Sequence, residues 1–289
     1  MTTVWAGLAT GALYSLVAIG YNVVLLTSGV FNFANAQLVM LSTFVAYFGL
    51  HTLGLPVPLA MLAGAVIVAA VAMLLERVAV RPLLTKGGDG HGTLITTIGF
   101  GVLLAGIVKQ IWGTDPLRVE PVVPAGAVTV LGGTVQPNDV LLIVLVVATG
   151  CGLHWWSRTT RNGLASLSSA ENRNAAMLRG INTRRLGIAA FAVAGAVAGL
   201  LGVFVATRTY AIASLGDSLS MFGFVAIAIG GAGSQLGGLL GGFVVGLIYS
   251  FSARYLGSEF PQIAVFFLFL LILMARPQGL FARNVERAV

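Results

Sequence analysis

The first 75 residues of the chain contain no lysine, arginine, aspartate or glutamate. Over all 289 residues only 9% are charged, whereas 57% are hydrophobic. A soluble domain carries about 25% charged residues. This shortage of charge excludes an ordinary soluble domain and indicates a membrane protein. Because a spanning helix needs about 20 mainly apolar residues, the uncharged stretch has room for three of them.

Residues that bind metals or perform covalent chemistry are also scarce. Cys151 is the single cysteine, which excludes an intrachain disulfide and a cysteine-based metal site. The histidines, His51, His91 and His154, are scattered near the ends of apolar segments, where packing explains them. No Ser/His/Asp set, Cys/His set or carboxylate pair converges at membrane depth. We therefore expect no metal site, no cofactor and no catalytic residue, and the chain is predicted not to be an enzyme.

Lysine occurs only at Lys86 and Lys109, and neither follows a glycine. A Walker-type phosphate loop needs a Gly-Lys pair, so the chain is predicted not to bind ATP in that manner. The apolar segments also lack an ionisable residue deep inside them. Ion-coupled carriers usually need one, so its absence disfavours that class of transporter.

Long apolar runs fill most of the chain. They cover residues 4–26, 38–55, 57–75, 94–112, 140–156, 186–206, 221–229, 239–251 and 261–275. In a bilayer only helices or closed barrels satisfy the backbone, and these continuous runs lack the alternation of barrel strands. We predict one all-α domain over residues 1–289, a polytopic membrane helix bundle. About eight transmembrane helices are expected, with two broken or re-entrant segments.

The basic residues are unevenly distributed. Residues 76–93 hold three, residues 157–185 hold six and residues 276–287 hold three, which makes twelve of the sixteen. The other basic residues share their side with five acids: Asp115, Glu120, Asp139, Asp217 and Glu259. The positive-inside rule places the twelve in the cytoplasm, with the C-terminus. This reasoning requires each polar interruption of the apolar runs to reverse the chain. A membrane also explains the net charge of +7 without nucleic acid.

The loop between residues 113 and 139, on the opposite side, is rich in proline and glycine. β-Branched residues flank Gly132 and Gly133. This pattern predicts a small β-hairpin at those glycines.

Two polar stretches interrupt the apolar runs. The early one is SGVFNFANAQ, Ser28–Gln37, and the late one is GGAGSQLGG, Gly230–Gly238. The late one is not a dinucleotide-binding loop, because Leu236 replaces its last glycine and no strand precedes it. Its glycines, and the small-residue spacings at Gly242/Gly246 and Gly195/Gly199, favour close helix packing.

Polar groups in hydrocarbon are costly unless hydrogen-bonded, so both stretches should contact protein or a water-filled path. Transporters often place their path at broken helices in corresponding halves of the fold. We therefore predict that both stretches approach the translocation pathway. The polar candidates are Asn32, Asn35, Gln37, Ser234 and Gln235. The alternative is that these side chains only satisfy neighbouring backbone and shape the interruptions.

A third stretch, SSAENRNAAMLRGINTRR, lies in the basic loop at 157–185. Ser168 and Glu171 match a capping box, which predicts that a short helix begins there, and Gly180 can end it. We interpret this loop as a coupling element that docks onto another protein. The alternative is a surface helix that rests on the bilayer. The docking candidates are Ala170, Glu171, Met177, Leu178, Gly180 and Ile181.

With these motifs in order, the sequence resembles the LivH-type permease subunit of branched-chain amino acid ABC importers. The resemblance is carried by NFANAQ at 32–37, AENRNAAMLRGIN at 170–182, GGAGSQLGG at 230–238 and RPQGLF at 276–281. These motifs cover essentially the full chain. The family typically reads N-F-A-H-G-E at the first motif, so Asn35, Ala36 and Gln37 replace its His, Gly and Glu.

The resemblance implies a multi-pass permease subunit of the bacterial inner membrane, surrounded by membrane lipid. It implies a LivM-type second permease subunit, two ATP-binding-cassette ATPase subunits that bind the ATP, and an extracytoplasmic substrate-binding protein. The expected substrates are branched-chain or other hydrophobic amino acids, or related small amides. Pairing with a second copy of the same chain is an open alternative. A self-sufficient secondary carrier, or a passive channel for a small neutral solute such as urea, are the alternative functions.

Overall fold

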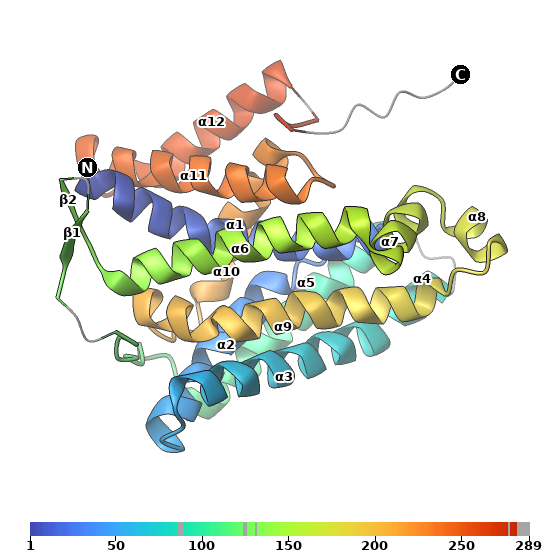
Figure 1. The fold of residues 1–289 in the computed structure, drawn as a ribbon, viewed down its shortest axis with the longest axis horizontal. Helices are drawn as coiled ribbons and strands as arrows, with labels where there is room; N and C mark the ends of the chain where they lie inside the picture. Colours follow the sequence, from blue (N-terminus) through green and yellow to red (C-terminus); the bar gives the residue numbers. More distant parts are fainter. Residues whose placement is uncertain (86–89, 124–125, 131, 277, 282–289) are drawn as a thin grey trace.

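The computed structural model describes residues 1–85, 90–123, 126–130, 132–276 and 278–281. It is a bundle of helices, as the sequence predicts (Figure 1). The helices are α1 (Thr2–Ser28), α2 (Asn35–Tyr47), α3 (Val57–Leu75), α4 (Arg81–Thr85), α5 (Gly90–Trp112), α6 (Pro137–Thr159), α7 (Arg161–Glu171), α8 (Arg173–Leu178), α9 (Thr183–Thr209), α10 (Leu215–Gly230), α11 (Gln235–Tyr255) and α12 (Pro261–Ala275). A π-helical turn, Phe48–Thr52, extends α2, and a second, Glu76–Val80, joins α3 to α4.

Six helices within the described residues are long and apolar enough to cross a membrane. They are α1, the continuous helix Val57–Leu84, α5, α6, α9 and α11. Two further apolar helices, α10 and α12, are shorter. Every predicted apolar run forms a helix, but α2, on the run 38–55, is also short, so six helices of spanning length stand against the eight expected. The polytopic membrane bundle is therefore confirmed.

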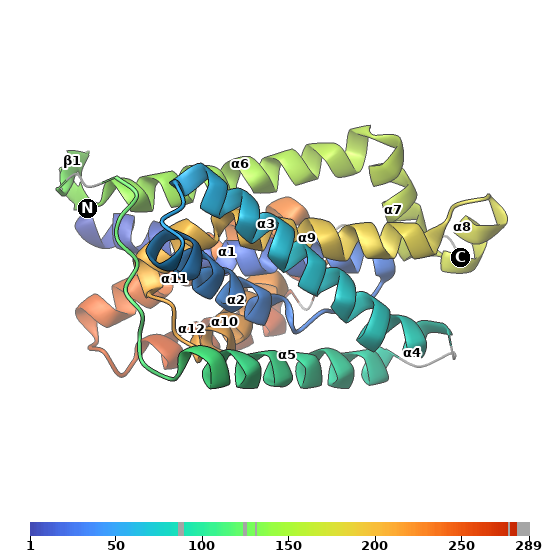
Figure 2. The ribbon, with the colours of Figure 1, turned by 90° about the horizontal axis from the view of Figure 1, so that it is seen from below.

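The bundle has two ends (Figure 1). The first, which we call the hairpin end, carries Met1 and the antiparallel hairpin of β1 (Val128–Val130) and β2 (Gly133–Val135). This hairpin confirms the prediction made from Gly132 and Gly133. The second, which we call the α8 end, carries α7 and α8 (Figures 1 and 2).

The predicted grouping of basic residues is consistent with this architecture. Helix α6 crosses from the hairpin end to the α8 end and α9 crosses back, so the arginines of 157–185 stay together (Figure 1). At the hairpin end, Arg208 of α9 forms an ion pair with Asp139 of α6 at 2.8 Å. Three of the twelve grouped basic residues, Lys86, Arg283 and Arg287, lie outside the described residues.

The two halves of the chain repeat one order of helices. Each half has a long helix, then a short non-helical segment, then a short helix and two further helices. In the first half these helices are α1, α2, α3 and α5, and in the second half they are α9, α10, α11 and α12. The packing is reciprocal, because α1 packs most extensively on α11 and α9 on α3. Since α1 and α9 run in opposite directions, the halves are inverted relative to each other (Figure 1).

Glycines allow the reciprocal pairs to approach closely. Gly246 of α11 packs on the backbone of Gly11 in α1, and Gly199 of α9 packs on Gly64 of α3. A Cβ atom at Gly246 or Gly199 would overlap the backbone of the opposite helix. The small-residue spacings in the sequence therefore mark helix–helix contacts.

The early interruption brings the chain back into the bundle. Helix α1 ends at Ser28, followed by Gly29 in the left-handed conformation with φ 69°. Helix α2 begins at Asn35, whose Nδ2 donates to the carbonyl oxygen of Val17 at 3.3 Å. Val17 precedes Ser28 by about three turns, so α2 starts roughly 16 Å inside the bundle from that end.

The second half has its own re-entrant segment, at residues 210–214. Helix α9 ends at Thr209, Ala211 forms an isolated antiparallel bridge with Leu117, and α10 begins at Leu215. Gly216 packs on the side chain of Gln37, so α10 also starts inside the bundle, beside the first turn of α2. This segment, and not the late polar stretch, is the structural counterpart of the early interruption.

The late interruption is a tight reversal between α10 and α11. Gly230 packs on Gly237, and Ala226 on Gly241, so the two helices lie against each other in opposite directions. Helix α2 likewise runs back toward the hairpin end after α1, packed mainly on α9 (Figure 1). Both polar interruptions therefore reverse the chain, as the predicted orientation requires.

Candidate functional site

The first turns of α2 and α10 meet in a polar contact inside the bundle. Gln37, the third residue of α2, donates from Nε2 to Oδ1 of Asp217, the third residue of α10, at 2.7 Å. Two glycines make room for it, because Gly216 packs on the Gln37 amide and Gly101 of α5 packs on its Cγ. Gln37 and Asp217 thus hold equivalent positions in the two halves.

Hydrogen-bond chemistry fixes the orientation of the amides. An ionised carboxylate and a backbone carbonyl only accept, so the NH₂ groups of Gln37 and Asn35 face Asp217 and Val17. Within the described residues, Gln37 Oε1 and Asn35 Oδ1 are then buried without a partner. A buried unsatisfied acceptor costs ~1–3 kcal/mol. The two unpaired amide oxygens in the first turn of α2 therefore lower the stability of the fold.

A groove of about 480 Å³ opens beside this contact, between α2, α5, α10 and α12. Figure 2 shows α5, α10 and α12 on one side of the bundle and α6 on the other. The polar lining is Gln37, Asp217 and Ser220, and the rest is mainly aliphatic and aromatic. The aromatic wall includes Phe224, whose ring lies 5.7 Å from that of Phe33. Asp217 is exposed to the groove.

The late interruption is held onto α1 by one buried side chain. Asn22 donates from Nδ2 to the carbonyl oxygen of Ser234 at 2.9 Å and accepts from the backbone N–H of Gly233 at 2.8 Å. Ser234 Oγ accepts from the N–H of Gly237 at 3.0 Å and caps α11. Ser234 thus has a structural contact at each of its polar groups.

The structure separates the predicted pathway residues into two places. Gln37 lines the groove, whereas Ser234 and Gln235 line a different cavity of about 80 Å³ near Arg158. Asn32 is fully buried, and its Oδ1 accepts from Ala34 N at 3.2 Å in the turn before α2. Gln37 is therefore together with Asp217, Asn35 lies in the same first turn but bonds to Val17 of α1, and Ser234 and Gln235 lie elsewhere.

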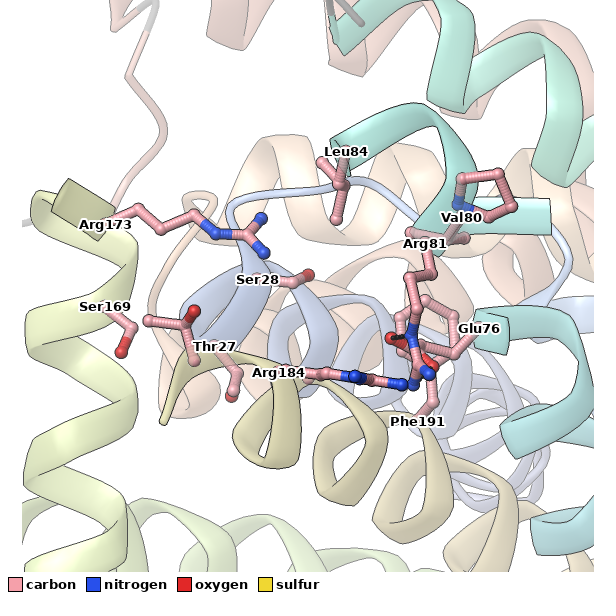
Figure 3. A pocket seen from close by; sticks show the side chains of 13 residues that line it. Thr27, Ser28, Glu76, Val80, Arg81, Leu84, Ser169, Arg173, Arg184 and Phe191 are labelled. Atoms are coloured by element: carbon pink, nitrogen blue, oxygen red, sulfur yellow. Dashed lines mark hydrogen bonds and ion pairs between the residues drawn. The ribbon is translucent and has the colours of Figure 1, made fainter. Parts of the chain in front are cut away.

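A further cavity, about 400 Å³, lies at the α8 end where α1, α7 and α9 approach one another. Figure 3 shows Arg173 reaching into it toward Ser28, while Arg184 extends toward Glu76 and Arg81. Glu76 is buried and accepts from Arg81 Nη2 at 2.6 Å and from Arg81 Nε at 3.3 Å. This basic cavity adjoins the predicted coupling element.

The coupling element begins differently from the capping-box prediction, which is wrong. Ser168 lies inside α7 and its Oγ donates to the carbonyl oxygen of Leu164, so it caps no helix. Asn172 starts α8 instead, since its Oδ1 accepts from Ala175 N at 3.0 Å. An asparagine competes well with serine for this role. Gly180, at φ 80°, ends the turn in the left-handed conformation as predicted.

Helix α8 projects from the end of the bundle (Figures 1 and 2). Its apolar residues are exposed, Met177 by 49% and Leu178 by 90%. Ala170 and Glu171 precede α8 at the end of α7, and Ile181 follows it. Because capping asparagines stand at both flanks, at Asn172 and Asn182, the helix is a defined element with a free apolar side chain.

Residues 3–275 match the protein family described as branched-chain amino acid transport system / permease component. The chain belongs to this family. It is 29% identical to the high-affinity branched-chain amino acid transport system permease protein BraD of Pseudomonas aeruginosa, over 97% of this chain and 95% of that protein. It is 27% identical to the permease protein LivH of Escherichia coli K12, with the same coverage. No solved structure matches the chain.

Two of the motifs that carry the resemblance pack on each other in this permease. The backbone N–H groups of Leu280 and Phe281, in RPQGLF, donate to the carbonyl oxygens of Ile229 and Gly230 at 2.8 and 3.2 Å. The RPQGLF motif is therefore hydrogen-bonded to the end of α10, where the late interruption begins.

Two site residues were missed from the sequence. Asp217 was placed with the acids of the outer side, but it lies in the first turn of α10 inside the bundle. Its signal was a carboxylate four residues before a long apolar run. Asn22 is fully buried and was overlooked within an apolar helix. An isolated amide in such a run is its only signal, since polar groups there need partners.

Proposed function

We propose that this permease is the transmembrane subunit of an ATP-binding-cassette importer. Its substrates are branched-chain or other hydrophobic amino acids, or related small amides, which it moves into the cytoplasm. The observation that carries the proposal is the meeting of two re-entrant half-helices at Gln37 and Asp217, beside a largely apolar groove. Re-entrant helix ends are tolerated at membrane depth where they line a path. The two relatives compared above carry branched-chain amino acid transport in their names.

The groove supports the need for a second permease subunit. It opens on the side of the bundle, between α5 and α12, and exposes Asp217. A carboxylate in contact with lipid at that depth is costly. We therefore infer that a LivM-type subunit covers the groove and completes the translocation path. A second copy of this chain is the alternative partner.

The asymmetry of charge supports an orientation. The α8 end carries most of the described arginines, which places it in the cytoplasm by the positive-inside rule. The C-terminus then lies in the cytoplasm, and an extracytoplasmic binding protein delivers substrate to the hairpin end. This arrangement fits a multi-pass subunit of a bacterial inner membrane, surrounded by lipid.

The projecting helix α8 favours the importer over a self-sufficient carrier or a passive channel. An exposed leucine on a capped helix at the basic end of the bundle fits a docking contact with another protein, which a carrier or channel of one chain does not have. In the importer it docks onto an ATPase subunit, which binds and hydrolyses the ATP. The permease itself then needs no cofactor and no catalytic group.

Leu178→Asp tests this coupling role. Burying a leucine side chain contributes ~1.5–3 kcal/mol, so its loss weakens association with the ATPase roughly tenfold or more. Since Leu178 is 90% exposed, the melting temperature of the purified chain should not change. Asn174→Asp, at an exposed site on the same helix, is the matched control. Normal ATP-driven uptake by the Leu178 variant would remove the docking role.

A further inference from the structure

Asp217 is the one acid that lines the groove among the residues described for it, and it has a single hydrogen-bond partner there. Gln37 donates to Oδ1 at 2.7 Å, while Oδ2 has no partner among the described residues. The residue is exposed although it lies beside the buried first turn of α2. A carboxylate oxygen is thus available to something that enters the groove.

The surroundings stabilise a negative charge at this position. Asp217 lies in the first turn of α10, and Gln37 lies in the first turn of α2. The positive ends of two helix dipoles therefore meet at the carboxylate, each contributing within its first turn. Neither Ala34 nor Ser214, the N-cap residues, makes a side-chain cap bond. The carboxylate of Asp217 therefore interacts favourably with both helix N-termini and accepts the hydrogen bond of the Gln37 amide.

The apolar walls of the groove indicate the chemistry of the rest of a ligand that contacts Asp217. Its walls include Met221, Phe224, Val225 and Phe269, and no basic side chain lines it among the described residues. A positive, hydrogen-bond-donating group on an apolar body matches this lining. A hydrophobic amino acid has both, in its ammonium group and its side chain. A small neutral amide has no charge to pair with Asp217.

We propose that Asp217 binds the ammonium group of the transported amino acid within the groove. The proposal rests on the importer function and selects the amino acids over the neutral amides as substrates. The pair is a charge-assisted hydrogen bond, which is shorter and stronger than a neutral one. Oδ2 of Asp217, which has no partner among the described residues, is the acceptor for an N–H of the ammonium group.

Charge selectivity in the groove is the first measurement. Ser220, which also lines the groove, is changed to cysteine in a Cys151→Ser background, so that this thiol is the only one in the chain, and the assembly without it gives the background rate. The purified assembly with its partner subunits is treated with a cationic and an anionic methanethiosulfonate. The cationic reagent should react faster, and Asp217→Asn should reduce the ratio of rates roughly tenfold, as expected for one nearby charge. Ser218→Asn, at an exposed neighbour, should leave the ratio unchanged.

Protection by ligand is the second measurement, on the same thiol. Leucine should slow its modification, isovaleramide should not, and Asp217→Asn should abolish the protection by leucine. Equal protection by isovaleramide, or protection that survives Asp217→Asn, would overturn the ammonium site. A thiol that neither reagent reaches would show that the second permease subunit occupies Asp217, and would also overturn it. ATP-driven leucine uptake by the unmodified assembly is measured in parallel, and its absence would instead refute the importer function.

Discussion

At the scale of single residues, the contact between Gln37 and Asp217 depends on a missing side chain. Gly216 lies where its Cβ would overlap the amide of Gln37. A side chain at position 216 would push the Gln37 amide out of its place beside Asp217. The sequence shows a glycine at that position but not the residue that it must accommodate.

Gly216→Ala should therefore reduce transport strongly. Overpacking of this kind costs ~1–3 kcal/mol, and it displaces Gln37 from Asp217. Gly106→Ala in α5 is the matched control, since nothing lies within 4 Å of its Cβ and alanine favours a helix by up to ~1 kcal/mol. Uptake by assemblies with equal amounts of each variant checks the prediction. Equal uptake by the two variants would show that the contact is dispensable.

Site residues could be predicted from the sequence where several polar residues are adjacent. Asn35 and Gln37 were found because a whole polar stretch interrupts the apolar sequence. Asp217 was missed because a single acid near the end of an apolar run resembles a loop residue. Only the return of α10 into the bundle brings it to Gln37, and that return is a tertiary event.

At the scale of elements, the late interruption is stabilised from a different helix. Asn22 of α1 uses both ends of its amide to hold the backbone of Gly233 and Ser234. Asn22 itself is fully buried. The reversal between α10 and α11 is thus attached to the centre of the bundle.

Asn22→Leu should lower the stability of the permease without touching the groove. The substitution removes two hydrogen bonds, one to the N–H of Gly233 and one to the carbonyl oxygen of Ser234, and each contributes a net ~0.5–1.5 kcal/mol. A lower melting temperature of the purified chain in detergent is the expected result. Asn162→Leu, at an exposed position in α7, should leave it unchanged. If both variants melt alike, Asn22 does not hold the reversal.

Helices could be predicted from composition, whereas one re-entrant segment could not. The early interruption is a polar stretch, but its counterpart at 210–214 reads Tyr-Ala-Ile-Ala-Ser and lies between the runs 186–206 and 221–229, where it resembles an ordinary loop. Its turn depends on Tyr210 at φ 62°, a left-handed conformation that tyrosine seldom adopts. A glycine at this position would have signalled the turn, and tyrosine does not.

At the scale of the whole molecule, the architecture is an inverted pair of four-helix halves. In the sequence, α6 lies between the two halves. Its reciprocal packing was not predictable, because the two halves share no motif. Gln37 and Asp217 occupy equivalent places with different chemistry. The charge asymmetry, in contrast, follows from counting arginines, and the reversals required for it are present.

The orientation can be tested with single cysteines in a Cys151→Ser background. Cysteine at Arg161 should react with a membrane-impermeant reagent only in inverted vesicles, and cysteine at Glu120 only in intact cells. Both positions are exposed, so access is decided by the side of the membrane. Labelling of position 161 in intact cells would reverse the proposed topology.

The central claim is that this chain moves amino acids only as part of an ATP-driven assembly. The most direct measurement is leucine uptake into proteoliposomes that contain either the purified assembly or this chain alone. With its binding protein outside and ATP available to the ATPase subunits, the assembly should accumulate leucine. This chain alone should not, with or without an imposed proton or sodium gradient. Gradient-driven accumulation by the chain alone would contradict the account and identify a self-sufficient carrier.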